Sequence, residues 1–104
     1  MSTHFRLVVD GFPQHDYDTR EEAEEAEERE RQRPWVTHPW VEEVEHLEPG
    51  TAVLLKPYGW RATDVRAFAG QTGWMHRYAG VDAQVRLPDG TLASLTDTEF
   101  ERKP

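Results

Sequence analysis

The second half of the chain carries two groups of aromatic and arginine residues whose types suit binding chemistry. Tyr58, Trp60 and Arg61 follow a proline within one short segment, and Arg77 and Tyr78 are adjacent farther along. An aromatic ring attracts a cation to its face. A guanidinium binds a phosphate or a carboxylate through paired hydrogen bonds. These five residues are therefore the predicted partner-binding site.

The aromatic residues also have a structural interpretation. Large aliphatic residues are few, so the core needs rings to fill it. We expect Trp74 to belong to the core. For Tyr58 and Trp60, a binding surface and packing against the N-terminal half both stay open as interpretations.

The sequence offers no recognisable set of residues for catalysis. Its two serines, Ser2 and Ser94, stand outside any nucleophile-elbow motif, and cysteine is absent. Five histidines are scattered without the short spacings typical of metal ligands. No glycine-rich loop leads into a helix in the way that phosphate-binding loops do. We therefore predict no enzymatic activity, no cofactor and no metal site.

Glycines divide the second half into short apolar runs. Six of the seven glycines lie between positions 50 and 90. The runs predict strands at 51–56, 64–68, 74–78, 83–87 and 91–95, then one helical turn at 96–100 and a short last strand up to residue 103. Pro88-Asp89-Gly90 predicts a hairpin turn with Gly90 in the left-handed conformation. The expected core is formed by apolar residues of these runs: Val53, Leu55, Val65, Phe68, Val85, Leu87 and Leu95.

Three motifs in this half resemble those of the SH3-like barrel superfamily, including its Tudor-like and KOW-type members. They are PGTAV at 49–53, FAGQTGWM at 68–75 and AQVRLPDG at 83–90. The resemblance implies a five-stranded barrel whose aromatic loops bind a proline-rich peptide or a cationic group. The stretch 56–66 is longer than the corresponding KOW segment, and the lysine-rich face of ribosomal KOW proteins is missing.

The first half predicts a β-β-α-β unit. Apolar residues alternate along 3–10, which indicates a strand, and 14–17 fits a short return strand. Thr19 and Glu22 form a capping-box pattern before a helix at 20–33 that Pro34 ends. Ala23 and Ala26 are its only apolar residues. Segment 40–47 fits either a helical stripe or a third strand, and we favour the strand.

Charge separates the two halves. The formal net charge is −8, with a balance of −9 over residues 1–49 and of +1 over residues 50–104. This acidity disfavours nucleic acid as a partner, because phosphates must be neutralised by basic residues. No apolar run approaches membrane-spanning length and no leader is apparent, so we expect a cytoplasmic protein without membrane attachment.

Together these features predict an α+β protein in which an acidic unit at 1–48 packs on an SH3-like five-stranded barrel at 49–104. The predicted function is a non-enzymatic protein-interaction module that binds through the barrel's aromatic loops or through the acidic helix. Two alternatives stay open. One is a nucleic-acid-associated regulatory protein of KOW or Tudor type. The other is a small inhibitor that mimics nucleic acid through the seven glutamates of 21–30.

Overall fold

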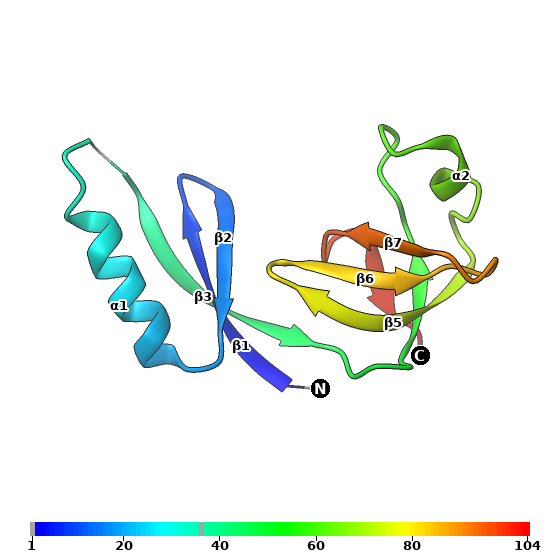
Figure 1. The fold of residues 1–104 in the computed structure, drawn as a ribbon, viewed down its shortest axis with the longest axis horizontal. Helices are drawn as coiled ribbons and strands as arrows, with labels where there is room; N and C mark the ends of the chain where they lie inside the picture. Colours follow the sequence, from blue (N-terminus) through cyan, green and yellow to red (C-terminus); the bar gives the residue numbers. More distant parts are fainter. Residues whose placement is uncertain (1, 36) are drawn as a thin grey trace. The chain divides into compact units, whose positions relative to one another are not determined.

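The structure is a computed structural model that describes residues 2–35 and 37–104. The chain forms two compact units, residues 1–46 and 47–104. Most of the regular structure lies in two antiparallel sheets, one in each unit (Figure 1). The predicted mixed α+β class is therefore confirmed.

The first unit contains a three-stranded sheet in the order β2-β1-β3. Its strands are β1 (Ser2–Val9), β2 (Phe12–Tyr17) and β3 (Pro39–His46), so the favoured third strand is present. Asp10 and Gly11 connect β1 to β2 with φ angles of 52° and 86°. Two successive residues with positive φ match the right-handed twist of a tight hairpin, and an Asp-Gly pair adopts this conformation readily.

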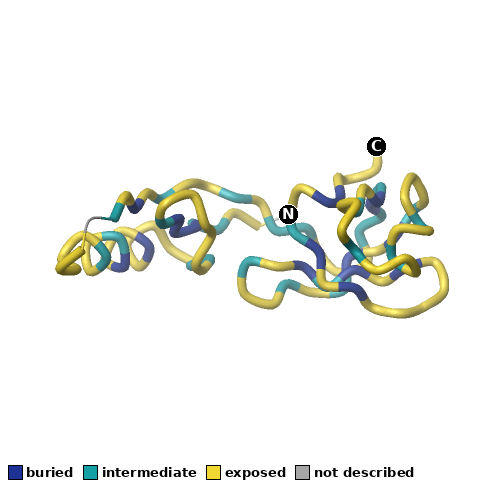
Figure 2. Tube along the Cα trace, turned by 90° about the horizontal axis from the view of Figure 1, so that it is seen from above, coloured by how far each residue is buried: buried dark blue, intermediate teal, exposed yellow. Residues whose placement is uncertain are grey.

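Helix α1 (Arg20–Arg31) lies across one face of this sheet (Figure 1). Thr19 caps it by accepting a hydrogen bond from the Glu22 backbone N–H at 3.2 Å, as the capping-box pattern predicts. Figure 2 shows that most of the helix is exposed. Its two buried residues are Ala23 and Ala26, so small side chains make the contact with the sheet. The helix ends two residues before the predicted end at 33.

The second unit contains a five-stranded sheet in the order β7-β6-β5-β4-β8. The strands are β4 (Ala52–Leu55), β5 (Thr72–Ala79), β6 (Asp82–Arg86), β7 (Leu92–Leu95) and β8 (Phe100–Arg102). Gly90 has a φ of 89° in the turn between β6 and β7, as predicted. One core of aliphatic and aromatic side chains packs on this sheet: Val53, Leu55, Met75, Ala83, Val85, Leu87, Ala93, Leu95 and Phe100.

The sheet is not a closed barrel, which corrects the expectation of closure. β7 and β8 form its two edges, and no strand pairing joins them within the described residues. These strands have only four and three residues, and the turn at Thr96–Glu99 connects them directly. Edge strands this short offer few backbone groups with which to close a ladder.

The predicted strand at 64–68 is wrong, because this segment contains the short helix α2 (Thr63–Arg66). Val65 and Phe68 lie three residues apart, so one helical turn brings both against the core, where they are half-buried. The other five predicted core residues are fully buried: Val53, Leu55, Val85, Leu87 and Leu95.

Trp74 is expected in the core, but it keeps 41% of its surface exposed and is not a core residue. Its neighbours Gly73 and Met75 are buried, because successive side chains of a strand point to opposite faces. At Gly73 the backbone is too close to β6 for any side chain. A Cβ there would lie 2.9 Å from the Arg86 carbonyl oxygen.

Candidate functional site

The loop between β4 and α2 carries three of the five predicted site residues. Tyr58 is 37% exposed and Trp60 is 71% exposed, and their ring centroids lie 5.8 Å apart. Neither ring belongs to the core cluster of this unit. The loop therefore presents aromatic surface to solvent.

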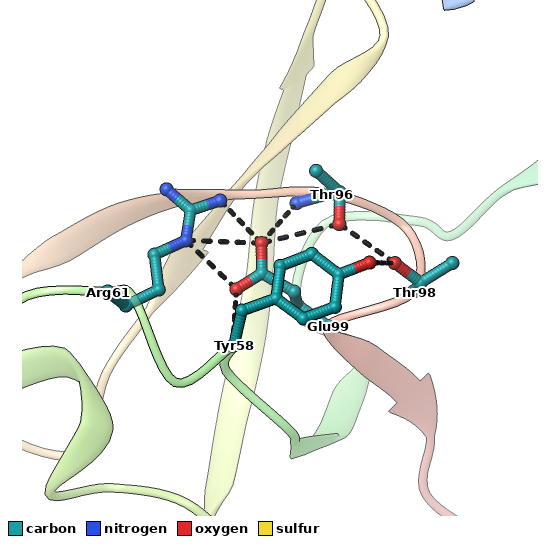
Figure 3. A network of polar contacts seen from close by, with 5 residues as sticks. All are labelled: Tyr58, Arg61, Thr96, Thr98 and Glu99. Atoms are coloured by element: carbon teal, nitrogen blue, oxygen red, sulfur yellow. Dashed lines mark hydrogen bonds and ion pairs between the residues drawn. The ribbon is translucent and has the colours of Figure 1, made fainter. Parts of the chain in front are cut away.

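A buried carboxylate anchors this loop (Figure 3). Glu99 has no exposed surface and accepts hydrogen bonds from both Nε and Nη2 of Arg61. The Nε contact to Oε2 measures 2.9 Å. The backbone N–H of Tyr58 donates to Oε2 at 3.0 Å, and the backbone N–H of Thr96 donates to Oε1 at 3.1 Å. One carboxylate thus joins the aromatic loop to the turn before β8.

The charge of this carboxylate is strongly favoured. Burial alone would raise the pKa of Glu99, but the hydrogen bonds from Arg61 and from the Tyr58 and Thr96 backbones outweigh it and lower the pKa to about 2. The hydrogen bonds that Arg61 donates to Glu99 raise the pKa of Arg61 above its ordinary value, although partial burial opposes this. Both partners therefore stay ionised at neutral pH.

Two further contacts fix the rings themselves. The guanidinium carbon of Arg61 lies 4.3 Å from the centroid of the Trp60 ring, which is a cation–π contact. The hydroxyl of Tyr58 hydrogen-bonds Oγ1 of Thr98 in the turn before β8 (Figure 3). Trp60 is therefore exposed on a loop that is held by its neighbours on both sides.

An open groove of about 330 Å³ adjoins the loop on the side of Arg61. One wall is formed by the start of the α2 segment and the other by β7. Apolar and polar side chains both contribute to its lining: Arg61, Ala62, Asp64, Val65, Leu87, Thr91, Leu92, Ala93, Ser94 and Leu95. The groove thus combines apolar surface with a small number of polar groups.

The structure does not bring Arg77 and Tyr78 to this site. Pairing of Leu54 with Thr72 places the aromatic loop beside the start of β5, whereas these two residues lie near its other end. Nε of Arg77 donates to Oε1 of Gln84 at 2.8 Å. Tyr78 is half-buried, and its hydroxyl accepts a hydrogen bond from the Leu47 N–H at 3.1 Å. The five predicted residues thus form two separate groups.

Sequence reasoning missed Glu99, the residue that organises the loop. The signal was present as Thr96-x-x-Glu99, which repeats the capping-box spacing. Glu99 reaches back to the Thr96 N–H as that motif requires, while its own N–H donates to the Thr96 carbonyl. The partners Tyr58 and Arg61 lie about forty positions away, so only the fold could reveal them.

A second polar cluster in the first unit was also missed. Arg6 is 3% exposed, and its Nε donates to Oδ1 of Asp16 at 2.7 Å. Nε2 of His46 lies 2.7 Å from the other oxygen of Asp16, and the rings of His4 and His46 stack with centroids 3.7 Å apart. Burial would raise the pKa of Asp16, but these hydrogen bonds lower it.

This second cluster has the chemistry of a structural ion-pair network. β1 pairs Arg6 with Asp16, and directly paired residues lie on the same face of a sheet. Arg20 of the helix contacts Glu43 and Phe5, which belong to the opposite face. The cluster therefore lies on the face of the sheet opposite the helix.

Across residues 2–35 and 37–104, no group of three or more histidine, aspartate or glutamate side chains is arranged to hold a metal ion. Within the same residues, neither helix has the length and apolar character needed to cross a membrane.

Comparison of the chain with models of protein families, with curated proteins and with solved structures found no match.

Proposed function

We propose that this protein is a non-enzymatic interaction module that binds a protein partner through the aromatic loop of its second unit. Tyr58, Trp60 and Arg61 are the contact residues. The observation that carries the proposal is the state of Trp60, which is 71% exposed on a loop anchored by a fully buried carboxylate.

Anchoring matters because a binding surface gains affinity when it is ordered before the partner arrives. Immobilising a flexible side chain on binding costs roughly 0.5–1.5 kcal/mol. Arg61 and Tyr58 are already held by Glu99 and Thr98, so much of this cost is met by the fold. Trp, Tyr and Arg are also the residue types most enriched at interface hot spots.

We further propose that the second unit is an SH3-like module whose sheet stays open. Four consecutive strands form an antiparallel meander, and the last strand returns to pair with the first, which gives the order β7-β6-β5-β4-β8. This strand order supports the resemblance of the motifs at 49–53, 68–75 and 83–90 to those of SH3-like barrels. In SH3-like modules the aromatic loops are the expected place for a ligand.

The acidic helix gives weaker support to the alternative that the protein is an inhibitor mimicking nucleic acid. Three of its seven glutamates are paired with arginines on the helix or just after it: Glu25 with Arg29, Glu27 with Arg31 and Glu30 with Arg33. These pairs reduce the negative potential that a phosphate mimic needs. A nucleic-acid partner would instead give binding that weakens steeply with added salt.

The test compares Trp60→Ala with Phe12→Ala. Both aromatic residues are 71% exposed, but Phe12 lies in the first unit, at the start of β2. Immobilised variants are used to capture proteins from the native cell extract, and thermal melting of each is measured. We expect Trp60→Ala to lose partners that the wild type and Phe12→Ala retain, while its melting changes little. Equal capture by all three, or capture that falls only with stability, would refute the proposal.

A further inference from the structure

We infer that the partner binds as an extended peptide, which adds a strand to the free edge of β7 in the groove between β7 and residues 61–65. This inference rests on the proposed function and names the form of its partner. Strand addition supplies affinity through backbone hydrogen bonds and specificity through alternate side chains.

The free edge of β7 exposes unpaired backbone groups. The Leu87 N–H donates to the Thr91 carbonyl at 2.8 Å, so Leu87 and Thr91 are a hydrogen-bonded pair of the ladder. In an antiparallel ladder such pairs alternate with pairs whose backbone groups point outward. The N–H and C=O groups of Leu92 and Ser94 therefore point away from β6. Within the described residues, no further strand pairs with this edge.

The other three edge strands carry features that discourage pairing with another chain. β2 contains Pro13, β3 contains three glutamates, and β8 contains Glu101 and Arg102. Proteins commonly protect their sheet edges with proline and charged residues. β7 has the sequence Leu-Ala-Ser-Leu, with neither feature, and Leu92 is 46% exposed. The unprotected edge is the one that borders the groove.

The groove is shaped for the alternate side chains of one added strand. Ala93 and Leu95 are buried and face the core, together with half-buried Val65 of α2. All three line the groove, and Figure 1 shows α2 beside β7. A peptide paired with β7 would place every second side chain on this apolar lining. The intervening side chains of the peptide would lie on the opposite face of the sheet, which carries the exposed side chains of Leu92 and Ser94.

Charge selects the peptide further. Of the two charged residues that line the groove, Arg61 is neutralised by Glu99, which leaves the exposed carboxylate of Asp64. This carboxylate favours a peptide with a lysine or arginine among its alternating apolar residues, because complementary charge speeds and orients association.

The groove argues against a second copy of this chain as the occupant. The β7 strand of a second copy, Leu-Ala-Ser-Leu, offers no basic residue to Asp64. Each copy would also bring its own 61–65 segment to the edge, where these residues wall the groove. An isolated peptide has neither obstacle.

The experiment selects peptides from a random phage-displayed library on the full chain, then measures their affinity for three variants. Ser94→Pro removes an outward N–H without breaking a ladder bond to β6, since proline is tolerated on a free edge. We expect it to weaken binding at least about tenfold, through the lost hydrogen bond and the bulk of the ring. Ser94→Ala keeps the N–H and should change affinity less than about twofold. Trp60→Ala reports on the aromatic loop separately.

Amide exchange of the wild type provides a measurement that needs no variant. We expect the Leu92 and Ser94 amides to exchange quickly in the free chain and slowly with a selected peptide bound. Selected sequences that alternate apolar residues and carry a basic residue would agree with the inference.

Several results would overturn it. Peptides that depend on Trp60 but tolerate Ser94→Pro, with no new amide protection, would retain the proposed function and exclude strand addition. A selection without binders would also exclude peptide addition, while the capture experiment would decide the proposed function independently. A concentration-dependent dimer that Ser94→Pro abolishes would identify a second copy as the occupant.

Discussion

Glu99 and Arg61 form an ion pair in which the carboxylate side chain has no exposed surface and the guanidinium side chain keeps 21% of its own. The pair joins the aromatic loop to the turn before β8, and it orients the cation that lies over Trp60. An interaction that positions an exposed aromatic loop in this way should have a measurable effect on stability.

Replacing Glu99 by Gln should destabilise the protein by about 2–3 kcal/mol. The guanidinium of Arg61 would lose its charged partner. The neutral amide would also turn its own NH₂ group towards hydrogen-bond donors that now face a carboxylate oxygen. Urea unfolding measures the change. Glu101→Gln is the matched control, because Glu101 forms an ion pair with Lys56 at 3.2 Å between half-exposed side chains. That variant should lose less than about 1 kcal/mol. Equal losses would mean that the buried pair has no special role.

Acid should weaken the protein over a defined range. The pKa of Glu99 lies at about 2, below its ordinary value of 4.5, so the unfolded chain takes up this proton first. The stability from this group is complete above about pH 4.5 and is lost as the pH falls towards 2, a change on the order of 3 kcal/mol. The lowered pKa of Asp16 acts in the same direction. The stability difference between the wild type and Glu99→Gln should therefore shrink across this range. A constant difference would contradict the assignment.

Ala26→Asp should destabilise the first unit strongly. Ala26 is 5% exposed where α1 meets the sheet, so the new carboxylate would be buried without a partner. We expect a loss of about 2–4 kcal/mol in chemical denaturation. Glu24→Gln changes an exposed residue of the same helix and should cost less than about 0.5 kcal/mol. A large loss from Glu24→Gln would show that the helix charges are structural.

The sequence by itself determined the elements whose signals are local. The capping box at Thr19 and Glu22 predicted the start of α1, and the two alanines predicted its buried face. Alternation along 83–87 and the Pro88-Asp89-Gly90 turn predicted the hairpin of β6 and β7. These signals are readable because hydrogen bonding and side-chain periodicity within a few residues decide them.

Only the tertiary structure decided the rest. Residues 64–68 are too few for their periodicity to separate a strand from a helical turn, and contact of Val65 and Phe68 with the same core goes with the turn. The separation of Arg77 and Tyr78 from Trp60 followed from the pairing of β4 with β5. Glu99 became the anchor because the fold brings donors from residues 58 and 61 to a turn about forty positions later. Burial and long-range hydrogen bonds depend on which segments meet in space, and local sequence does not encode that.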